Sequence, residues 1–170
     1  MGNFESKCYY AAKSGSAPTL HQIRNDFINQ FDVNKSLYDS LSLLGLTIKS
    51  NNIEAVQEIL KFPNIDVNHP MGAGVTPIAL AISTKNIEIV RLLLDHGALA
   101  FNKEKGYSIN SPLRCVLQYY TSKDNYTEMV KLLIEHGAQK ELTKDFIYWL
   151  QSDITVKNSA IFLYIKSFQI

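Results

Sequence analysis

Few side chains of this sequence are spaced for chemistry. The histidines His21, His69, His96 and His136 lie far apart in the chain. His96 and His136 each stand directly before a glycine, and no carboxylate or thiol accompanies them as a zinc site would require. A solvent-exposed histidine at a helix C-terminus is favoured by the helix dipole. We therefore expect structural histidines and no metal.

The remaining candidates for chemistry also favour structural roles. Cys8 and Cys115 lack C-x-x-C spacing, so we expect no disulfide, a reducing compartment, and a buried Cys115. The segment Met71-Gly72-Ala73-Gly74 lacks the preceding strand and the following Lys-Ser/Thr of a phosphate loop. Glu88 and Glu128 recur at equivalent places in a repeat, whereas a catalytic pair occurs once. The sequence therefore predicts no catalytic residue, no cofactor and no enzyme.

The N-terminus matches a lipidation pattern. Met1-Gly2-Asn3-Phe4-Glu5-Ser6 fits the N-myristoylation motif with Gly2 as the acceptor, and Cys8 is a candidate for a palmitoyl group. One acyl chain gives only marginal membrane binding, so both modifications would matter. A chance match, or a glycine left by cloning, stays the alternative.

Composition narrows the class of partner. The chain has 170 residues, of which 46% are hydrophobic and 19% charged, with a formal net charge of +1. These values are typical of a soluble globular protein and lack the basic excess of a nucleic-acid binder. Only Arg24, Arg91 and Arg114 are arginines, the side chain best suited to phosphate. Without an apolar run of membrane length or a signal-peptide pattern, we expect a cytoplasmic protein.

The elements that would position these residues follow a repeat. The segment 86–98 aligns with 126–138, and each is preceded by a helix opener, Thr76-Pro77-Ile78 or Ser111-Pro112-Leu113. The openers lie 35 residues apart and the terminating glycines 40, which predicts an insertion at 121–125 between two helices. The segment 52–60 is a third copy, 34 residues before the first segment.

A fourth, degenerate copy lies at the N-terminus. Asp66-Val67-Asn68 recurs as Asp32-Val33-Asn34, again 34 residues away, and we expect Asn68 to bridge a turn between repeats. In this first unit one helix ends near Gly15, and Thr19 is expected to cap a second helix over 20–31.

Each repeated feature has a physical reason. Thr76 and Ser111 are N-cap residues, and the proline after each needs no amide hydrogen at the first helical position. Decay of the earlier opener to Ser42-Leu43-Leu44 predicts weaker capping there. Apolar stripes are expected to face inward, and glycines to end the second helices. The stripes are Ile78, Ala81 and Ile82 on one helix and Val90, Leu93 and Leu94 on the next.

The pattern T-P-L-x-x-A, then V-x-x-L-L-x-x-G-A, then D-V-N, resembles ankyrin repeats. The histidine that usually follows T-P-L is replaced by Ala79 and Arg114. The resemblance implies an all-α solenoid of helix-turn-helix units with degenerate capping units at both ends. We expect an N-terminal capping repeat at 1–34, repeats at 35–68, 69–104 and 105–138, and a C-terminal capping helix pair at 139–170.

This resemblance implies a partner-binding surface made of turn tips and the exposed side of each first helix. Mapped onto this sequence, the surface contains Tyr38, Asp39, Lys49, Val75, Ser83, Thr84, Tyr107, Asn110, Gln118, Tyr119 and Tyr120. Tyrosine buries a large ring and keeps a hydroxyl, so Tyr107, Tyr119 and Tyr120 are candidate anchors. Their packing beneath the 121–125 insertion is the alternative.

The predicted role is non-catalytic binding of another protein, with nucleic acid disfavoured and membrane contact only if Gly2 is lipidated. A short ankyrin-like chain of this composition resembles a secreted bacterial effector acting in a host cell, and equally a small protist adaptor or a poxvirus-like ankyrin protein. Two rival roles stay open. One is a lipid-anchored regulatory or targeting subunit of an enzyme. The other is a self-associating module that uses the last helix, expected over 155–168 after a helix at 143–151, because that segment is apolar nearly all round.

Overall fold

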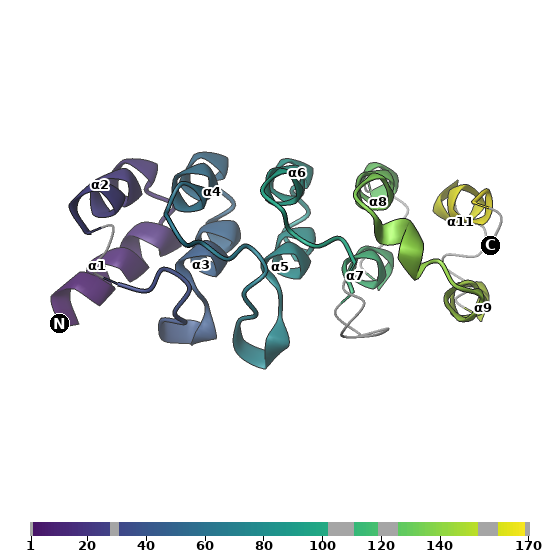
Figure 1. The fold of residues 1–170 in the computed structure, drawn as a ribbon, viewed down its shortest axis with the longest axis horizontal. Helices are drawn as coiled ribbons and strands as arrows, with labels where there is room; N and C mark the ends of the chain where they lie inside the picture. The colour runs from purple at the N-terminus through teal and green to yellow at the C-terminus, as the bar shows by residue number, and fades with distance from the viewer. Residues whose placement is uncertain (1, 28–30, 102–110, 119–125, 153–159, 169–170) are drawn as a thin grey trace. The chain divides into compact units, whose positions relative to one another are not determined.

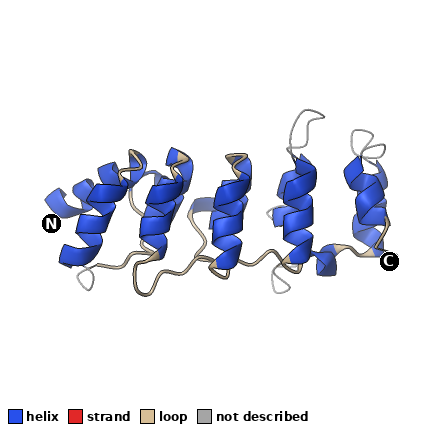
Figure 2. Cartoon of the chain, turned by 90° about the horizontal axis from the view of Figure 1, so that it is seen from above, coloured by secondary structure: helices blue, strands red, loops and turns tan. Residues whose placement is uncertain are grey.

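A computed structural model describes residues 2–27, 31–101, 111–118, 126–152 and 160–168. The chain divides into two compact units, Met1–Ala98 and Leu99–Ile170. Every regular element within the described ranges is helical (Figures 1 and 2).

The first unit consists of three helix pairs. Its inner layer holds the first helix of each pair and its outer layer the second, as the two rows in Figure 1 show. Short 3₁₀ turns precede the second and third pairs. In chain order the elements are α1 (Gly2–Lys13), α2 (Ala17–Phe27), η1 (Tyr38–Ser40), α3 (Leu43–Ser50), α4 (Ile53–Leu60), η2 (Gly72–Gly74), α5 (Pro77–Ser83) and α6 (Ile87–Asp95).

Side-chain caps start the helices of the second and third pairs. The Thr76 hydroxyl accepts a hydrogen bond from the Ala79 amide at 3.4 Å, and Pro77 follows it as predicted. Asn52 and Asn86 cap the outer helices α4 and α6 through their carbonyl oxygens. Polar residues therefore satisfy amides that a helix start would otherwise leave without partners.

Stacked apolar stripes form the core of the first unit. Helix α3 packs on α1 and α5, while α4 packs on α2 and α6. Val90, Leu93 and Leu94 are buried on α6, as predicted from their spacing, and so are Ile78, Ala81 and Ile82 on α5. No pair could cover its own apolar side, so each is stabilised by its neighbours.

Asparagines connect successive loops of this unit. The Asn68 side-chain amide donates to the Gly97 carbonyl at 3.1 Å, which confirms the predicted bridge between repeats. One repeat earlier, Asn34 donates to the Asn64 carbonyl at 2.8 Å and accepts from the Asp66 amide at 2.8 Å. The recurring D-V-N segments therefore fix the spacing of consecutive helix pairs.

The second unit contains α7 (Pro112–Gln118), α8 (Tyr126–Glu135), η4 (Ala138–Glu141), α9 (Lys144–Ser152) and α11 (Ala160–Lys166). Ser111 accepts from the Arg114 amide at 3.2 Å, as its opener predicts. Cys115 is buried, also as predicted. The proposed insertion at 121–125 lies outside the described residues.

Three sequence expectations need correction. Thr19 does not cap the second helix: α2 begins two residues earlier, at Ala17, and the Ser16 and Thr19 hydroxyls share a hydrogen bond at 2.8 Å. The predicted end of that helix at Phe31 is also wrong, because Phe31 lies in a bend; α2 is described as far as Phe27, and 28–30 lie outside the described residues. The hydrogen bond that caps the decayed opener is no longer than the one at Thr76: the buried Ser42 hydroxyl accepts from the Gly45 amide at 3.3 Å, against 3.4 Å at Thr76.

The last helix is only partly covered. Ile161, Phe162 and Ile165 are buried, and α11 packs against α8. Leu163, on the same helix, is 67% exposed. The apolar segment at the C-terminus thus folds back on its own unit on one face and leaves another face open.

Candidate binding surface

Two exposed turns project next to the inner layer of the first unit. In each, the amide of one residue donates to a carbonyl four residues later: Leu37 to Leu41 at 2.8 Å and Met71 to Val75 at 2.9 Å. The turns lie below α3 and α5 in Figure 1. Their central residues, Asp39 and Ala73, adopt left-handed backbone conformations with φ of 63° and 59°. The exposed tips therefore recur 34 residues apart with the same geometry.

The two turns touch each other. A Cβ placed on Gly72 would come within 2.6 Å of the Ser40 Cβ and 3.2 Å of the Ser40 carbonyl oxygen. Glycine at this position lets the second turn pack directly against the first. The tips consequently form one continuous surface in this unit rather than two separate projections.

Inner-helix residues of the predicted set lie beside this surface. Lys49 and Ser83 are exposed, while Val75 and Thr84 are half-buried. The Ser83 and Thr84 hydroxyls donate to carbonyls of their own helix, Leu80 at 2.6 Å and Ala81 at 2.7 Å. Each hydroxyl oxygen keeps acceptor capacity for a donor on a partner.

The first unit contributes a polar network that our sequence mapping missed. The Tyr9 hydroxyl donates to an Asp39 carboxylate oxygen at 3.0 Å and accepts from the Lys13 ammonium at 2.6 Å. Lys13 also lies 3.8 Å from that carboxylate, and the hydrogen bond to Tyr9 raises the pKa of Lys13. This network joins α1 to the tip of the first turn.

A signal for Lys13 was present in the sequence. Lys13 precedes the left-handed Gly15 by two residues, and Lys49 precedes the left-handed Asn51 by the same interval. Alignment of the helix ends rather than the helix openers would have placed both lysines in one row. Because the N-terminal capping repeat lacks a recognisable helix opener, the equivalence of Lys13 and Lys49 was not apparent from the openers.

Several predicted contact residues cannot be placed. Tyr107, Asn110, Tyr119 and Tyr120 lie outside the described residues, so both interpretations of the tyrosines stay predictions. Tyr38 belongs to the first turn, but the structure describes only its backbone. Gln118 ends α7 in the second unit and is exposed.

The proposed lipidation residues have different environments. Gly2 is the first residue of α1, and its acylation stays a prediction. The Cys8 side chain is only 2% exposed, and burial raises the pKa of its thiol to about 11. An inaccessible, protonated thiol argues against palmitoylation of the folded chain.

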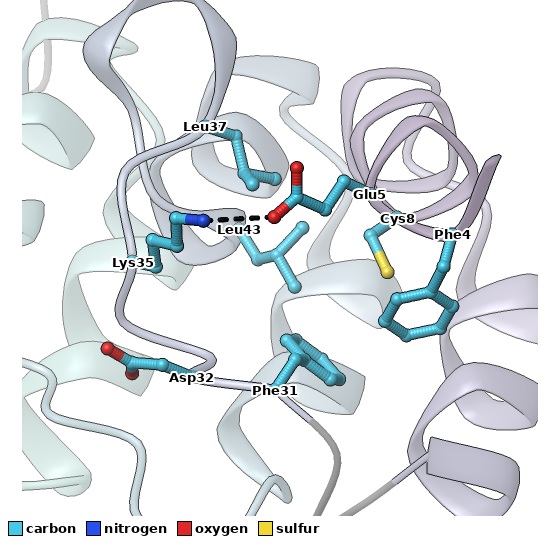
Figure 3. Close-up of a pocket in the computed structure, with 8 residues that line it drawn as sticks. All are labelled: Phe4, Glu5, Cys8, Phe31, Asp32, Lys35, Leu37 and Leu43. Atoms are coloured by element: carbon cyan, nitrogen blue, oxygen red, sulfur yellow. Dashed lines mark hydrogen bonds and ion pairs between the residues drawn. The ribbon is translucent and has the colours of Figure 1, made fainter. Parts of the chain in front are cut away.

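Cys8 lines a small cavity in the first unit (Figure 3). Phe4, Phe31 and Leu43 form part of its apolar wall, and an ion pair of 2.9 Å between Lys35 and Glu5 lies at its edge. The cavity measures about 20 Å³, which is room for roughly one water molecule. It is far too small for an acyl chain or a cofactor.

The histidines at the C-terminal ends of α6 and α8 form hydrogen bonds that agree with the predicted structural role. His96 Nδ1 lies 2.8 Å from the Leu92 carbonyl oxygen, and His136 Nδ1 lies 2.8 Å from that of Leu132. A carbonyl oxygen only accepts, so each Nδ1 carries the proton and donates. Gly97, which follows His96, ends its helix at a φ of 88°. Within the described ranges, no group of three potential ligands could hold a metal ion.

The backbone pattern of capped helix pairs, projecting turns and bridging asparagines agrees with the comparison against protein families. The sequence model described as ankyrin repeats (3 copies) matches residues 8–105, more than half of the chain. The chain belongs to the ankyrin-repeat family. No curated protein matches it. The predicted all-α ankyrin fold is thereby confirmed.

The family match also extends into the predicted N-terminal capping repeat at 1–34. It begins at Cys8 and so includes most of this capping repeat, where the sequence resemblance was weakest. Repeats of the ankyrin family generally act as protein–protein interaction modules. No helix in the described parts of this ankyrin-repeat chain is long and apolar enough to cross a membrane. The limits of the five predicted units, including the repeat at 105–138, stay predictions.

Proposed function

We propose that this ankyrin-repeat chain is a non-catalytic module that binds a partner protein across its turns and inner helices. The single observation that carries the proposal is the continuous exposed surface formed by the two contacting turns and the inner-helix residues beside them. Its residues include Asp39, Lys49, Ala73 and Ser83, which are exposed although neighbours such as Leu44 and Ile82 are buried.

This surface is pre-organised. The turns are closed by backbone hydrogen bonds, and Asp39 is held by Tyr9 and Lys13 before any partner arrives. A surface with fixed backbone and side-chain geometry loses little conformational entropy on binding. It also suits a partner that presents a matching rigid or extended segment.

Site-specific photocrosslinking tests the proposal. A photoreactive phenylalanine analogue replaces Ser83 on inner helix α5 in one protein and Gln57 on outer helix α4 in another. Both positions are exposed, so neither replacement opens the core. We expect a discrete crosslinked protein from source-cell lysate with the probe at position 83 and none at position 57. The same yield from both positions, or crosslinking only from position 57, would refute the proposed surface.

Self-association through the last helix is a second candidate. It is favoured by the exposed Leu163, together with Phe168, which is 39% exposed just after α11. Replacement of Leu163 with Asp removes the apolar contact without touching the buried face. Analytical ultracentrifugation should then show a lighter species than the wild-type chain if copies associate through this helix. A wild-type monomer at all concentrations would exclude this role.

The finer context of the proposal rests on sequence alone. A cytoplasmic location, action as an effector in a host cell, and a lipid-anchored regulatory role all remain hypotheses. Intact-mass analysis of protein made in eukaryotic cells tests the lipid anchor, because a myristoyl group on Gly2 adds a defined mass. An unmodified N-terminus would exclude that role.

A further inference from the structure

The two helix layers of the first unit carry charge of opposite sign. The inner helices hold more cations than acids: Lys7, Lys13 and Lys49 against Glu5. The outer helices hold more acids than cations: Asp26, Glu54, Glu58, Glu88 and Asp95 against Arg24 and Arg91. When the turn residue Asp39 and the helix-end residues Lys61 and Lys85 are included, the net charge of the inner layer stays positive and that of the outer layer stays negative.

Both acids on the inner side already have cationic partners. Glu5 forms an ion pair with Lys35 at 2.9 Å. Asp39 accepts a hydrogen bond from Tyr9 and lies 3.8 Å from Lys13. Their negative charge is therefore matched within the protein and is less able to repel an incoming carboxylate.

Lys49 differs from these residues. It is exposed in the last turn of α3, and no ion pair joins it to any other residue in the described ranges. The helix dipole favours a cation at this end of α3 and also favours Glu54 and Glu88 in the first turns of α4 and α6. It does not explain Asp26, Glu58 or Asp95, which lie later in their helices. Lys49 is thus an exposed cation on the proposed binding surface, without an ion-pair partner in the described ranges.

The second unit, taken alone, shows the same difference between the helices of a pair. Helix α7 carries Arg114 and no acid. Helix α8 carries Glu128 and Glu135 against Lys131. The later pair of that unit does not repeat it, because α9 carries Lys144 and Asp145 and α11 carries Lys166 and no acid.

We propose that the surface of the turns and inner helices binds an acidic segment of the partner protein, with Lys49 pairing directly with one of its carboxylates. This inference rests on the proposed function and adds the chemistry of the partner. Opposite charge across an interface steers association and selects among partners, whereas like charge disfavours a wrong orientation. The acidic outer layer repels the same segment and so directs it to the inner side.

A carboxylate-bearing peptide fits this surface better than nucleic acid. A nucleic-acid binding site needs several adjacent lysine or arginine side chains, because each neutralises a phosphate. Here Lys13 is already engaged by Asp39 and Tyr9, which leaves Lys7 and Lys49 as the exposed inner-helix lysines outside any ion pair in the described ranges. The small net charge of +1 gives no long-range attraction for a polyanion.

Fluorescence anisotropy with defined probes tests the inference on the full chain. The probes are a labelled dodecapeptide of alternating Glu and Gly, the same peptide with Lys in place of Glu, and a single-stranded oligothymidine of similar length. Each is titrated at low ionic strength, where exposed charges are least screened. The variant is Lys49→Glu, and the matched control is Lys131→Glu, which makes the same charge change at an exposed position of the outer helix α8.

The acidic peptide should bind the wild-type chain and the control variant equally. Its affinity for Lys49→Glu should fall on the order of three- to tenfold, as expected for an exposed pair that becomes a repulsion. Equal affinity for both variants, absence of binding to the wild-type chain, or preference for the basic peptide would overturn the inference. So would tighter, Lys49-dependent binding of the oligothymidine. None of these results alters the photocrosslinking outcome, so the proposed function is judged separately.

Discussion

Replacement of Gly15 with Ala tests how the first helix pair is joined to the second. Gly15 has a φ of 64°, and a Cβ there would lie 2.7 Å from the Ser50 hydroxyl oxygen and 2.8 Å from the Asn52 Cβ. Asn52 cannot easily move, because its side chain caps α4. Gly97 provides a matched control, since its φ is 88° but nothing lies within 4 Å of an added Cβ.

The two substitutions share one energetic cost and differ in another. Alanine in a left-handed conformation costs about 1–2 kcal/mol at either position. Only Gly15→Ala adds a steric term, typically about 1–3 kcal/mol for overpacking. Any stabilisation from reduced freedom of the unfolded chain is the same for both and cancels in the comparison. Gly15→Ala should therefore be less stable than Gly97→Ala by about 1–3 kcal/mol.

Urea unfolding followed by far-ultraviolet circular dichroism gives the two free energies of unfolding. Hydrogen exchange with mass spectrometry then locates the loss, which should concentrate in the amides of α1 and α2. Repeat stacks are stabilised by contacts between neighbours, so weakening one interface should free the terminal pair first. Equal destabilisation by the two variants would show that the first pair does not pack against Ser50 and Asn52 as described.

Three further predictions follow from particular contacts. Asn68→Ala should lose about 1 kcal/mol of stability, because its bond to the Gly97 carbonyl is removed, and a urea midpoint equal to wild type would contradict this. The ammonium of Lys61 and the ring of His21 lower the pKa of Glu58. At pH 7 the free energy of unfolding of the wild-type chain should therefore exceed that of Glu58→Gln by up to about 1 kcal/mol. That advantage should be fully present above the ordinary pKa of a glutamate and should vanish as pH falls through the lowered pKa of Glu58. A difference that grows in acid would reverse the assigned sign. Cys8 and Cys115 are both buried, so a disulfide thiol reagent at pH 8 should label neither quickly in the native chain and both in denaturant, whereas rapid native labelling would contradict the packing.

Much of the fold follows from local patterns in the sequence. Thr76 and Ser111 cap helices because a short hydroxyl side chain reaches an amide three residues later, which is a purely local property. The stripe of Val90, Leu93 and Leu94 predicts its own burial because the spacing matches one helical face. These signals depend on neighbours in sequence, so a single chain suffices to find them.

The errors arose where tertiary contacts replace local signals. Decay of the second opener suggested weak capping, yet Ser42 alone supplies the cap and the surrounding core buries it. Thr19 resembles an N-cap, but Ser16 precedes a helix that tolerates Pro18 in its first turn. Local propensity identified the helix but not the residue at which it begins.

The exposure of part of the candidate site was predicted, while its role in binding stays a proposal. Asp39, Lys49 and Ser83 are exposed as the family resemblance implied, because positions equivalent in a repeat share an environment. The Tyr9–Lys13–Asp39 network was missed because it joins residues 30 apart across two helix pairs. No period in the sequence encodes that contact, since neither Tyr9 nor Asp39 is repeated in the later units.

A direct measurement of the central claim compares partner affinity in two blocking variants, once photocrosslinking has supplied the partner. Ser83→Trp places a bulky side chain on the proposed surface, and Gln57→Trp places the same side chain on the outer layer. With equal circular dichroism spectra for both, calorimetry should show at least a tenfold loss of affinity for Ser83→Trp and none for Gln57→Trp. Unchanged affinity in Ser83→Trp, with loss in Gln57→Trp, would contradict binding through the turns and inner helices.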